Sequence, residues 1–470
     1  MSFVPPSGGR LRLERWWNAL LAGLERSGLL PARPGVSAAW RPRWKSLPRR
    51  PARRLPFHAL GFRQWLNLAL AVLGLFYLAF GLLYLWTGKA VNHLGVDFRT
   101  FRASAEIAWK YGFGHIYDPA KQDEFQKPWY DQGIFGTGFD SYDYAPTYYL
   151  PAFALLFLPL LLFDPRTSFY LWTGLNLLLL VLYLWRFRQA LPDHLDWGIL
   201  TRMVLSVPVF TSLLAGQVNV LLLIGLGEFI LALIRGRDFR AGLWLAGLLL
   251  KWQVLIFFLP GLLLGRRFRV LAGFALAATF ILALSVVLVG PDGLLAVGRL
   301  YLQASFGENR TINPQLMMNW RSLAANLSRV LPPALAWVPA VIGMVATAMA
   351  ALSLWLRRPE VSSPSFGFVL LGTYAATCAA SWHMHIYTGL PLILPLLLLY
   401  GQGRISWKTV YLWLYVPAAL FPLLYLLTSE LAFSLIGLTM LGLNLVLLGR
   451  SVWAVVRERG GRPPAQACFN

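Results

Sequence analysis

The sequence has 470 residues, of which 57% are hydrophobic and only 13% are charged, whereas a soluble globular protein carries roughly 25% charged residues. Its mean hydropathy is +0.57, and apolar runs such as 65–86 and 333–356 are long enough to cross roughly 30 Å of hydrocarbon. These features exclude a soluble enzyme and predict an all-helical polytopic membrane protein with about twelve transmembrane helices.

The basic residues are concentrated at the N-terminus. Thirteen of the Lys and Arg residues behind the net charge of +22 lie in the first 64 positions, mixed with Pro, Trp and Leu. This composition suits a mostly unstructured or interfacial tail that contacts anionic lipid headgroups, and no nucleic-acid partner is expected. The first long apolar run begins only near Trp65, which is too late for a secretory signal. Two cysteines, Cys378 and Cys468, offer neither a disulfide framework nor a zinc site.

The distribution of Arg and Lys orients the predicted helices, because short cytoplasmic loops carry an excess of both residues. Basic loops lie at 235–240, 265–269, 357–358 and 404–408, and a basic tail follows at 457–470. With all of these on one side, both termini are cytoplasmic in a multi-pass protein of the plasma membrane. The loops 88–147 and 290–332 are then extracytoplasmic.

The membrane domain, 65–456, is expected to hold long helices of alternating direction. They are predicted at 65–87, 167–185, 199–215, 218–235, 270–289, 333–356, 366–380, 386–400, 410–427 and 431–456. Two shorter segments, 241–250 and 252–264, are predicted to form a hairpin that turns at Lys251. The segment 148–163 would break the alternation if it crossed, and its prolines predict a re-entrant or interfacial course.

The first outer loop holds the strongest candidate for chemistry. From Asp97 to Gly112, apolar residues recur at helical spacing, which predicts an amphipathic helix lying on the membrane surface. Asp97 stands at its start, where a carboxylate can accept a proton from a substrate hydroxyl, cap free backbone N–H groups, or do both. Candidates for contact with a substrate, such as a sugar or a lipid headgroup, are Arg102, Tyr117, Asp118, Asp143 and Tyr144. An interfacial aromatic belt is an alternative explanation of the tyrosines.

These residues also carry a resemblance to a known family. Asp97 with Phe98, Phe101 and Ala103 is followed by Tyr117 with Asp118, by Tyr144 with Pro146, and by the run Gly216-Gln217-Val218-Asn219. In this order the motifs resemble those of the polyprenol-phosphate-sugar-dependent glycosyltransferases of family 87, in the GT-C superfamily, from Trp65 to Leu448. The sequence departs from the family's pattern at Asn313-Pro314-Gln315 and at His383-Met384-His385.

The resemblance implies a GT-C-type fold and a set of roles. Asp97, which matches the aspartate of the first loop, is implied to be the general base that deprotonates the acceptor hydroxyl. The implied donor is a hexose, typically mannose, on a polyprenyl phosphate, and the anomeric carbon is implied to invert.

Transfer from a lipid-linked phosphate needs a base, fixed cations for the departing phosphate, and groups that hold the sugar. Lys251 lies in an apolar stretch, where an unpaired ammonium costs at least about 2.5 kcal/mol. It is predicted to bind the donor phosphate, with a snorkelling lysine as the alternative. Gln217 and Asn219 offer amides to the sugar, unless they merely form a turn between helices.

Further polar residues follow on the same predicted face. The second outer loop adds Arg310 and Arg321 as candidates for the donor phosphate, and Asn313 and Gln315 as candidates for the acceptor. A solvated loop is the alternative for all four, while an arginine offers a bidentate clamp to phosphate. His383 and His385 are predicted to hydrogen-bond the phosphate or the sugar, with structural histidines or metal ligands as alternatives.

The sequence therefore predicts a membrane glycosyltransferase that acts on a glycolipid or polysaccharide acceptor, with no metal or other cofactor beyond the lipid-linked donor. It contains no P-loop and no acidic pair typical of nucleotide-sugar binding. The alternative is a membrane transporter or lipid flippase, for which an inverted repeat with charges near the midplane is typical. No convincing repeat is found in the sequence, and the charged residues gather on one face.

Overall fold

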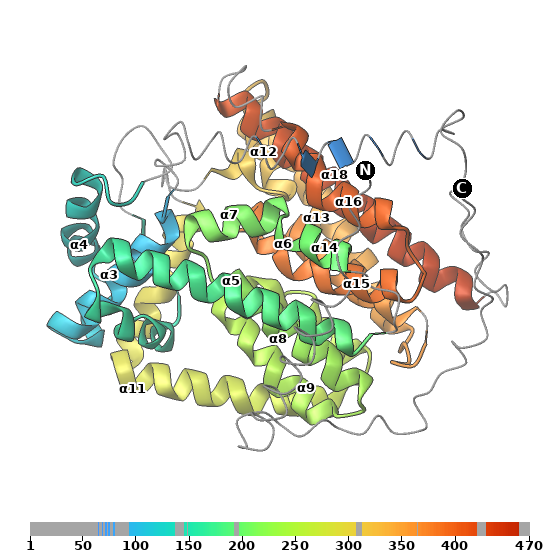
Figure 1. Cartoon of the computed structure of the whole chain (residues 1–470), viewed down its shortest axis with the longest axis horizontal. Helices are drawn as coiled ribbons and strands as arrows, with labels where there is room; N and C mark the ends of the chain where they lie inside the picture. Colours follow the sequence, from blue (N-terminus) through green and yellow to red (C-terminus); the bar gives the residue numbers. More distant parts are fainter. Residues whose placement is uncertain are drawn as a thin grey trace, which may run out of the picture. The chain divides into compact units, whose positions relative to one another are not determined.

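The structure is a computed structural model that describes residues 94–136, 145–147, 149–191, 197–306, 313–363, 365–420 and 429–459, with a few positions between 64 and 79. Every regular element in these ranges is a helix, which confirms the predicted class (Figure 1). Almost all of the predicted tail at 1–64 and most of the predicted helix at 65–87 lie outside the described residues.

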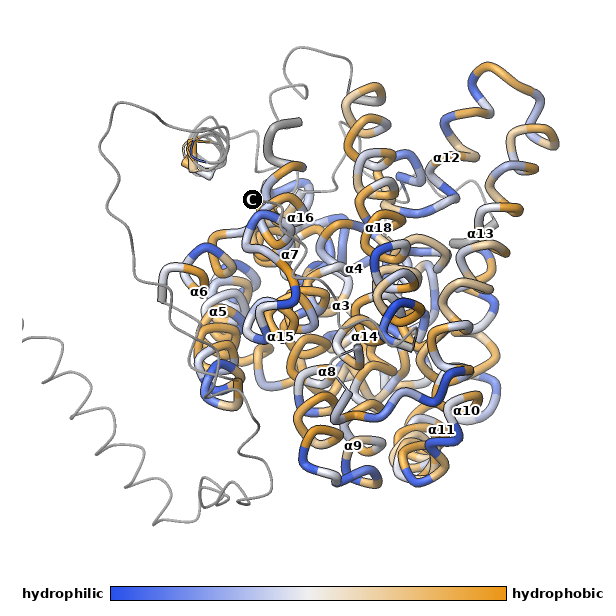
Figure 2. The backbone as a smooth tube through the Cα atoms, turned by 90° about the vertical axis from the view of Figure 1, so that its right-hand side faces the viewer, coloured by the Kyte–Doolittle hydropathy of each residue, from blue (hydrophilic) through white to orange (hydrophobic). Residues whose placement is uncertain are grey.

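Five helices of the described part are long and apolar enough to cross a membrane. They are Pro165–Gln189, Gly198–Ala215, Phe268–Gln303, Pro333–Leu356 and Leu431–Glu458. A sixth span results if the bent pair Asp238–Leu255 and Phe258–Leu264 is counted as one. Hydrophobic residues predominate along these helices in Figure 2. The chain is thus a membrane protein, but the count of about twelve spans is not confirmed, because several predicted spans fold as helices shorter than roughly 20 residues.

Local sequence explains where the first of these helices begin and end. Helix α5 (Pro165–Gln189) is capped by Asp164, whose carboxylate accepts hydrogen bonds from two backbone N–H groups of the first turn. The predicted helix at 199–215 is divided into α6 (Trp197–Val204) and α7 (Val207–Ala215). α7 ends at Gly216, whose φ of 69° lies in the left-handed region that glycine tolerates best.

Helix α8 (Asn219–Ile234) is followed by a broken pair of helices. α9 (Asp238–Leu245) leads through η7 (Ala246–Leu255) to α10 (Phe258–Leu264), and the two halves are bent by 106°. Helical geometry is lost at Lys251, where φ is −137° and ψ is 75°. The break predicted at Lys251 is therefore present, although the main bend follows a few residues later.

Helix α11 (Phe268–Phe306) runs closely beside α9 (Figure 1). A Cβ on Gly242 of α9 would lie only 1.9 Å from the carbonyl oxygen of Val270, so this crossing depends on a glycine. α11 kinks at Gly290 and stays helical to its end. The predicted outer loop at 290–332 consequently begins as helix.

The first outer loop folds around α3 (Val96–Tyr111), which confirms the predicted helix. The helix is more enclosed by protein than the pattern alone indicates, because Arg99 and Arg102 are only 0% and 4% exposed. Its place on the membrane surface stays a prediction. The short helices η4 (Phe113–His115) and α4 (Pro119–Asp131) pack against α3 from within the same loop.

The segment predicted to be re-entrant or interfacial also covers α3. It forms two 3₁₀ helices, η5 (Pro151–Leu156) and η6 (Leu158–Leu162), both of which contact α3. Each is far shorter than the roughly 20 residues of a transmembrane helix. The segment therefore packs over α3 instead of adding a long helix to the bundle.

The second half of the chain builds most of the remaining core. Its elements are η8 (Pro314–Leu316), α12 (Trp320–Leu327), α13 (Pro333–Leu356), α14 (Phe366–Ala380), η9 (Ile386–Leu392), α15 (Ile393–Gly401), α16 (Trp407–Leu420) and α18 (Ser429–Arg459). α14 lies against both α13 and α18, and its residues from Phe366 to Ala379 are buried. This enclosed helix ends in the loop that carries the two candidate histidines.

Candidate active site

The start of α3 and the turn between α7 and α8 are packed as one unit. The backbone N–H of Gly95 donates to the carbonyl oxygen of Leu214 at 2.8 Å. A Cβ on Gly216 would lie 2.5 Å from the Cβ of Phe98, so glycine is needed there for close approach as well as for its backbone angles. This packing brings Asp97, in the first turn of α3, beside the turn that holds Gln217.

Asp97 has the surroundings of a chemically active carboxylate. The N-cap of α3 is Gly95, so helix capping by Asp97 is not observed. Burial raises the pKa of Asp97, and the charge of Lys251, a side-chain hydrogen bond with Gln217 and the charge of Arg99 partly offset this rise. A carboxylate with a raised pKa is a better proton acceptor once it is ionised.

Lys251 supplies a buried cation near this carboxylate. Its side chain is almost inaccessible, and its Nζ lies 3.5 Å from Thr388 Oγ1 and 4.8 Å from the centroid of the Tyr387 ring. The charges of Lys251 and Asp97 influence each other. No direct ion pair joins them in the described part of the chain. The two charges are thus held near each other without neutralising each other by contact.

The predicted amides of the 216–219 turn are buried beside Asp97. Gln217 is 3% and Asn219 0% exposed, and Asn219 Nδ2 donates to Ser212 Oγ at 3.2 Å. Among the described residues, neither Gln217 Oε1 nor Asn219 Oδ1 has a hydrogen-bond partner. A buried acceptor without a partner is uncommon in folded proteins. Both oxygens are therefore suited to accept hydrogen bonds from substrate hydroxyls.

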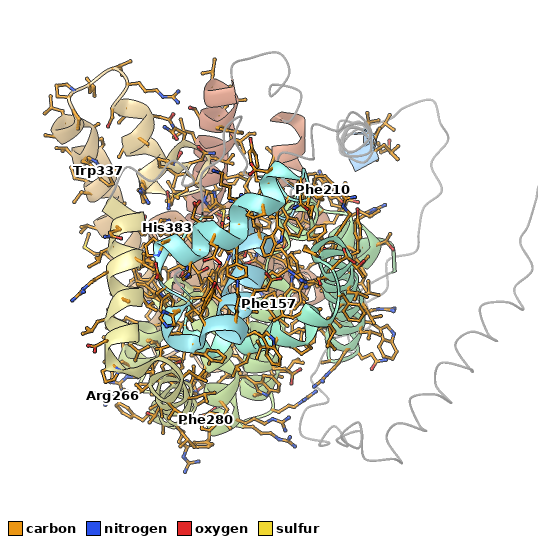
Figure 3. The ribbon with its side chains drawn as sticks, turned by 90° about the vertical axis from the view of Figure 1, so that its left-hand side faces the viewer. Phe157, Phe210, Arg266, Phe280, Trp337 and His383 are labelled. Carbon is orange, nitrogen blue, oxygen red and sulfur yellow. The ribbon has the colours of Figure 1, made fainter. Side chains whose placement is uncertain are left out.

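The loop after α14 brings the two histidines toward the same cluster. Asn319, the N-cap of α12, donates from Nδ2 to the carbonyl oxygens of Ser381 at 2.6 Å and Trp382 at 3.1 Å. The guanidinium of Arg321 lies 4.9 Å from the Trp382 ring centroid. In Figure 3, His383 of this loop lies well above Arg266, which belongs to a loop predicted to be cytoplasmic.

Both histidines are neutral near pH 7. Burial, together with the charges of Arg321, His385 and Lys251, lowers the pKa of His383 to about 3. Burial and the charges of Lys251 and Arg321 lower that of His385 to about 3. Each ring can then donate one hydrogen bond and accept another. The described residues contain no group of three or more His, Cys, Asp or Glu side chains arranged for a metal ion.

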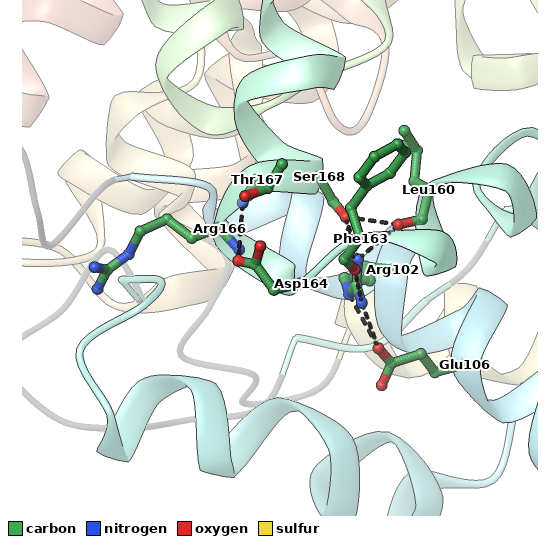
Figure 4. Close-up of polar contacts among 8 residues, drawn as sticks. All are labelled: Arg102, Glu106, Leu160, Phe163, Asp164, Arg166, Thr167 and Ser168. Atoms are coloured by element: carbon green, nitrogen blue, oxygen red, sulfur yellow. Dashed lines mark hydrogen bonds and ion pairs between the residues drawn. The ribbon is translucent and has the colours of Figure 1, made fainter.

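Arg102 lies on α3 but is engaged elsewhere, as Figure 4 shows. It pairs with Glu106 at 3.0 Å and donates to the carbonyl oxygens of Leu160 and Phe163 at 3.0 and 2.9 Å. It also donates to the hydroxyl of Ser168. These contacts join α3 to η6 and to the start of α5.

Tyr117 and Asp118 are likewise bound within the outer loop. The hydroxyl of Tyr117 donates to the carbonyl oxygen of Tyr149 at 2.6 Å, and Asp118 caps α4 by accepting from the N–H of Ala120 at 2.9 Å. They lie with Arg102 among the contacts that hold this loop together. Their predicted contact with the acceptor stays a prediction.

The other predicted residues are distributed around η8 or fall outside the description. Asn313 is the N-cap of η8, and Gln315 accepts from Ser322 Oγ through its backbone carbonyl at 2.6 Å. Both side chains are half-buried. Asp143, Tyr144 and Arg310 lie outside the described residues.

The structure thus brings together Asp97, Gln217 and Lys251, and the charge of Lys251 reaches both histidines. Two residues that contact Lys251 directly, Tyr387 and Thr388, were not predicted from the sequence. Their signal in the sequence was weak, since they only follow the two histidines by a few positions.

The described part of the chain is thus an all-helical membrane fold that buries a carboxylate, a nearby lysine and two amide oxygens in one region. The model of glycosyltransferase family 87 matches residues 147–381, which is half of the chain. The chain therefore belongs to this family and is a membrane glycosyltransferase, consistent with the GT-C superfamily. The transporter alternative is not supported.

The matched range includes Gln217, Asn219, Lys251 and Arg321, whereas Asp97 precedes it and His383 follows it. No curated protein and no solved structure matches the chain.

Proposed function

We propose that the protein transfers a hexose, with mannose as the expected sugar, from a polyprenyl-phosphate donor to a glycolipid or polysaccharide acceptor. The observation that carries this proposal is the placement of Asp97 near Lys251 and Gln217 without a direct ion pair. A carboxylate and a lysine that lie near each other without forming an ion pair can act on an acceptor hydroxyl and a phosphate that bind side by side. We place the reaction on the extracytoplasmic face of the plasma membrane, with both termini cytoplasmic.

In the proposed reaction, the acceptor oxygen attacks the anomeric carbon while the bond from that carbon to the phosphate oxygen breaks. Asp97 takes the proton of the acceptor hydroxyl, and the polyprenyl phosphate leaves with the electron pair. A single displacement of this kind inverts the anomeric carbon. The general base is expected to contribute roughly 10²- to 10⁴-fold to the rate.

The leaving phosphate gains negative charge, which a preorganised cation stabilises. Lys251 fits this role because it is a buried lysine near Asp97. His383, His385 and Arg321 are proposed to complete the phosphate side. Gln217 and Asn219 are proposed to accept hydrogen bonds from the sugar, since each has a buried oxygen without a partner among the described residues.

The test is transfer of labelled mannose from synthetic polyprenyl-phosphate-mannose to endogenous membrane acceptors, by purified protein in nanodiscs. Wild type is expected to transfer the sugar, and Asp97→Asn is expected to lose transfer. Asp131→Asn, an exposed aspartate at the end of α4, is the matched control. Equal transfer by wild type and Asp97→Asn would remove Asp97 as the base. Preference for polyprenyl-phosphate-glucose would replace mannose as the sugar.

A further inference from the structure

Lys251 is held by a segment that lies far along the chain. The ring of Tyr387 is 4.8 Å from Nζ, measured to its centroid, and the hydroxyl of Thr388 is 3.5 Å away. Both residues belong to η9, and 137 positions separate Lys251 from Thr388. The ammonium therefore faces one aromatic ring and one hydroxyl from the same short helix.

This part of η9 is itself held in place. The hydroxyl of Tyr374, in the enclosed helix α14, donates to the carbonyl oxygen of Thr388 at 2.8 Å. A Cβ on Gly389 would lie 2.8 Å from the ring of Trp413, so the chain passes tightly against α16. The position of the Tyr387 and Thr388 backbone is thus set by the core.

Lys251 is tied to the same loop through its own neighbours. Gln253 Nε2 donates to the carbonyl oxygen of His383 at 3.5 Å, and Ser381 Oγ donates to the carbonyl oxygen of Gln253 at 3.1 Å. The backbone at Lys251 is non-helical, which directs its side chain independently of the helical turns around it. The 251–253 stretch and the 381–388 stretch therefore form one joined unit.

The contacts of Lys251 suit an ammonium that must remain able to bind an anion. An ammonium over an aromatic face is attracted by the ring quadrupole, and the attraction grows when both groups are withdrawn from water. Unlike a carboxylate, a ring does not cancel the positive charge. The ring centroid of His385 is 5.3 Å from that of Tyr387. Because His385 is neutral near pH 7, it does not repel the ammonium.

We propose that Tyr387 is a positioning residue, which together with Thr388 holds the Lys251 ammonium in place to receive the phosphate of the lipid-linked donor. This inference rests on the proposed function, in which Lys251 binds that phosphate. It adds a specific means by which a lysine without an ion pair keeps its position.

The test measures binding of decaprenyl phosphate to purified protein in nanodiscs, so that it does not depend on the identity of the sugar or the acceptor. Tyr387→Leu is expected to weaken binding about tenfold. Tyr387→Phe keeps the ring face and is expected to restore binding to within about threefold of wild type. Tyr170→Leu, at an exposed position on α5, is the matched control for loss of a tyrosine.

A double-mutant cycle separates positioning from a general structural effect. In a Lys251→Met background, Tyr387→Leu is expected to cause no further loss, because the ring then has no ammonium to hold. Equal losses in both backgrounds would overturn the positioning role while leaving Lys251 as the phosphate ligand. Unchanged binding in Lys251→Met alone would overturn both the inference and the donor-phosphate role of Lys251. The melting temperature of each variant reports whether it is folded.

Discussion

Two polar groups on helix α3 lie little more than one turn apart and have opposite surroundings. Arg102 meets a carboxylate, a hydroxyl and two backbone carbonyls at hydrogen-bonding distance. Asp97 is near Lys251 but forms no direct ion pair with it in the described part of the chain. Helix α3 therefore carries one charged side chain, Arg102, whose donors are taken up by protein contacts, and one, Asp97, that has fewer such contacts.

In the proposed function, this difference separates a group that stabilises the fold from one that takes part in the reaction. A buried ion that is fully paired contributes to the fold, and removal of one partner leaves the other uncompensated. A carboxylate whose pKa burial has raised is less stable as an ion, but it is ready to take a proton from a substrate. We therefore expect substitutions at the two positions to affect different properties.

Asp97→Asn is expected to have the largest effect on catalysis and no adverse effect on stability. Loss of the general base lowers the rate roughly 10²- to 10⁴-fold. Because the folded-state pKa of Asp97 is raised, stability falls as pH rises from the ordinary pKa through the raised one, and the ionised form is destabilising at pH 7. The asparagine variant should thus melt at the same temperature as wild type or higher. A variant that is both inactive and less stable would show that Asp97 also supports the fold.

Arg102→Met is expected to have the converse effect. Removing one partner of a buried ion pair typically destabilises by about 3–5 kcal/mol, and Glu106, the other partner, is itself only 22% exposed. We expect a large drop in the melting temperature in detergent. Arg166→Met, which removes an exposed arginine of the neighbouring helix start, is the control and should melt like wild type. If folded Arg102→Met instead showed a selective rise in KM for the acceptor, the sugar contact predicted from the sequence would gain support.

The contrast between the two groups could be predicted only in part. The helix over Asp97 to Gly112 followed from its apolar spacing, and the bounds of α13 and α14 followed from Pro333 and from the apolar run at 366–380. The break at Lys251 followed from a charge within an apolar stretch. These are local signals, which a single sequence contains.

What could not be predicted depends on contacts between distant segments. The carbonyl groups that bind Arg102 come from 58 and 61 positions later in the chain, and no periodicity reveals them. Tyr387 approaches Lys251 only because the 381–388 loop is joined to η7. The number of spans is not confirmed for a related reason, since burial by neighbouring helices allows short apolar helices where lipid would require long ones.

Gln217→Leu is expected to move the pH dependence of activity. A hydrogen bond from Gln217 lowers the pKa of Asp97, so its loss raises that pKa further. The acid limb of kcat/KM should lie above the ordinary carboxyl pKa of about 4 in wild type and move to still higher pH in the variant. Gln402→Leu, in the loop before α16, is the matched control and should leave the limb in place. Movement to lower pH would contradict the assigned hydrogen bond.

Tyr117→Phe is expected to have the smallest effect. Its hydroxyl is buried and donates its proton to the carbonyl oxygen of Tyr149, so the phenylalanine variant leaves that carbonyl without its donor and loses about 1 kcal/mol of stability. Because the proton is committed to the backbone, we expect KM for the acceptor to stay unchanged while the melting temperature falls slightly. Tyr117 would then belong with Arg102 among the saturated groups of the outer loop. A raised KM with an unchanged melting temperature would place it beside Asp97, in contact with the acceptor as the sequence predicted.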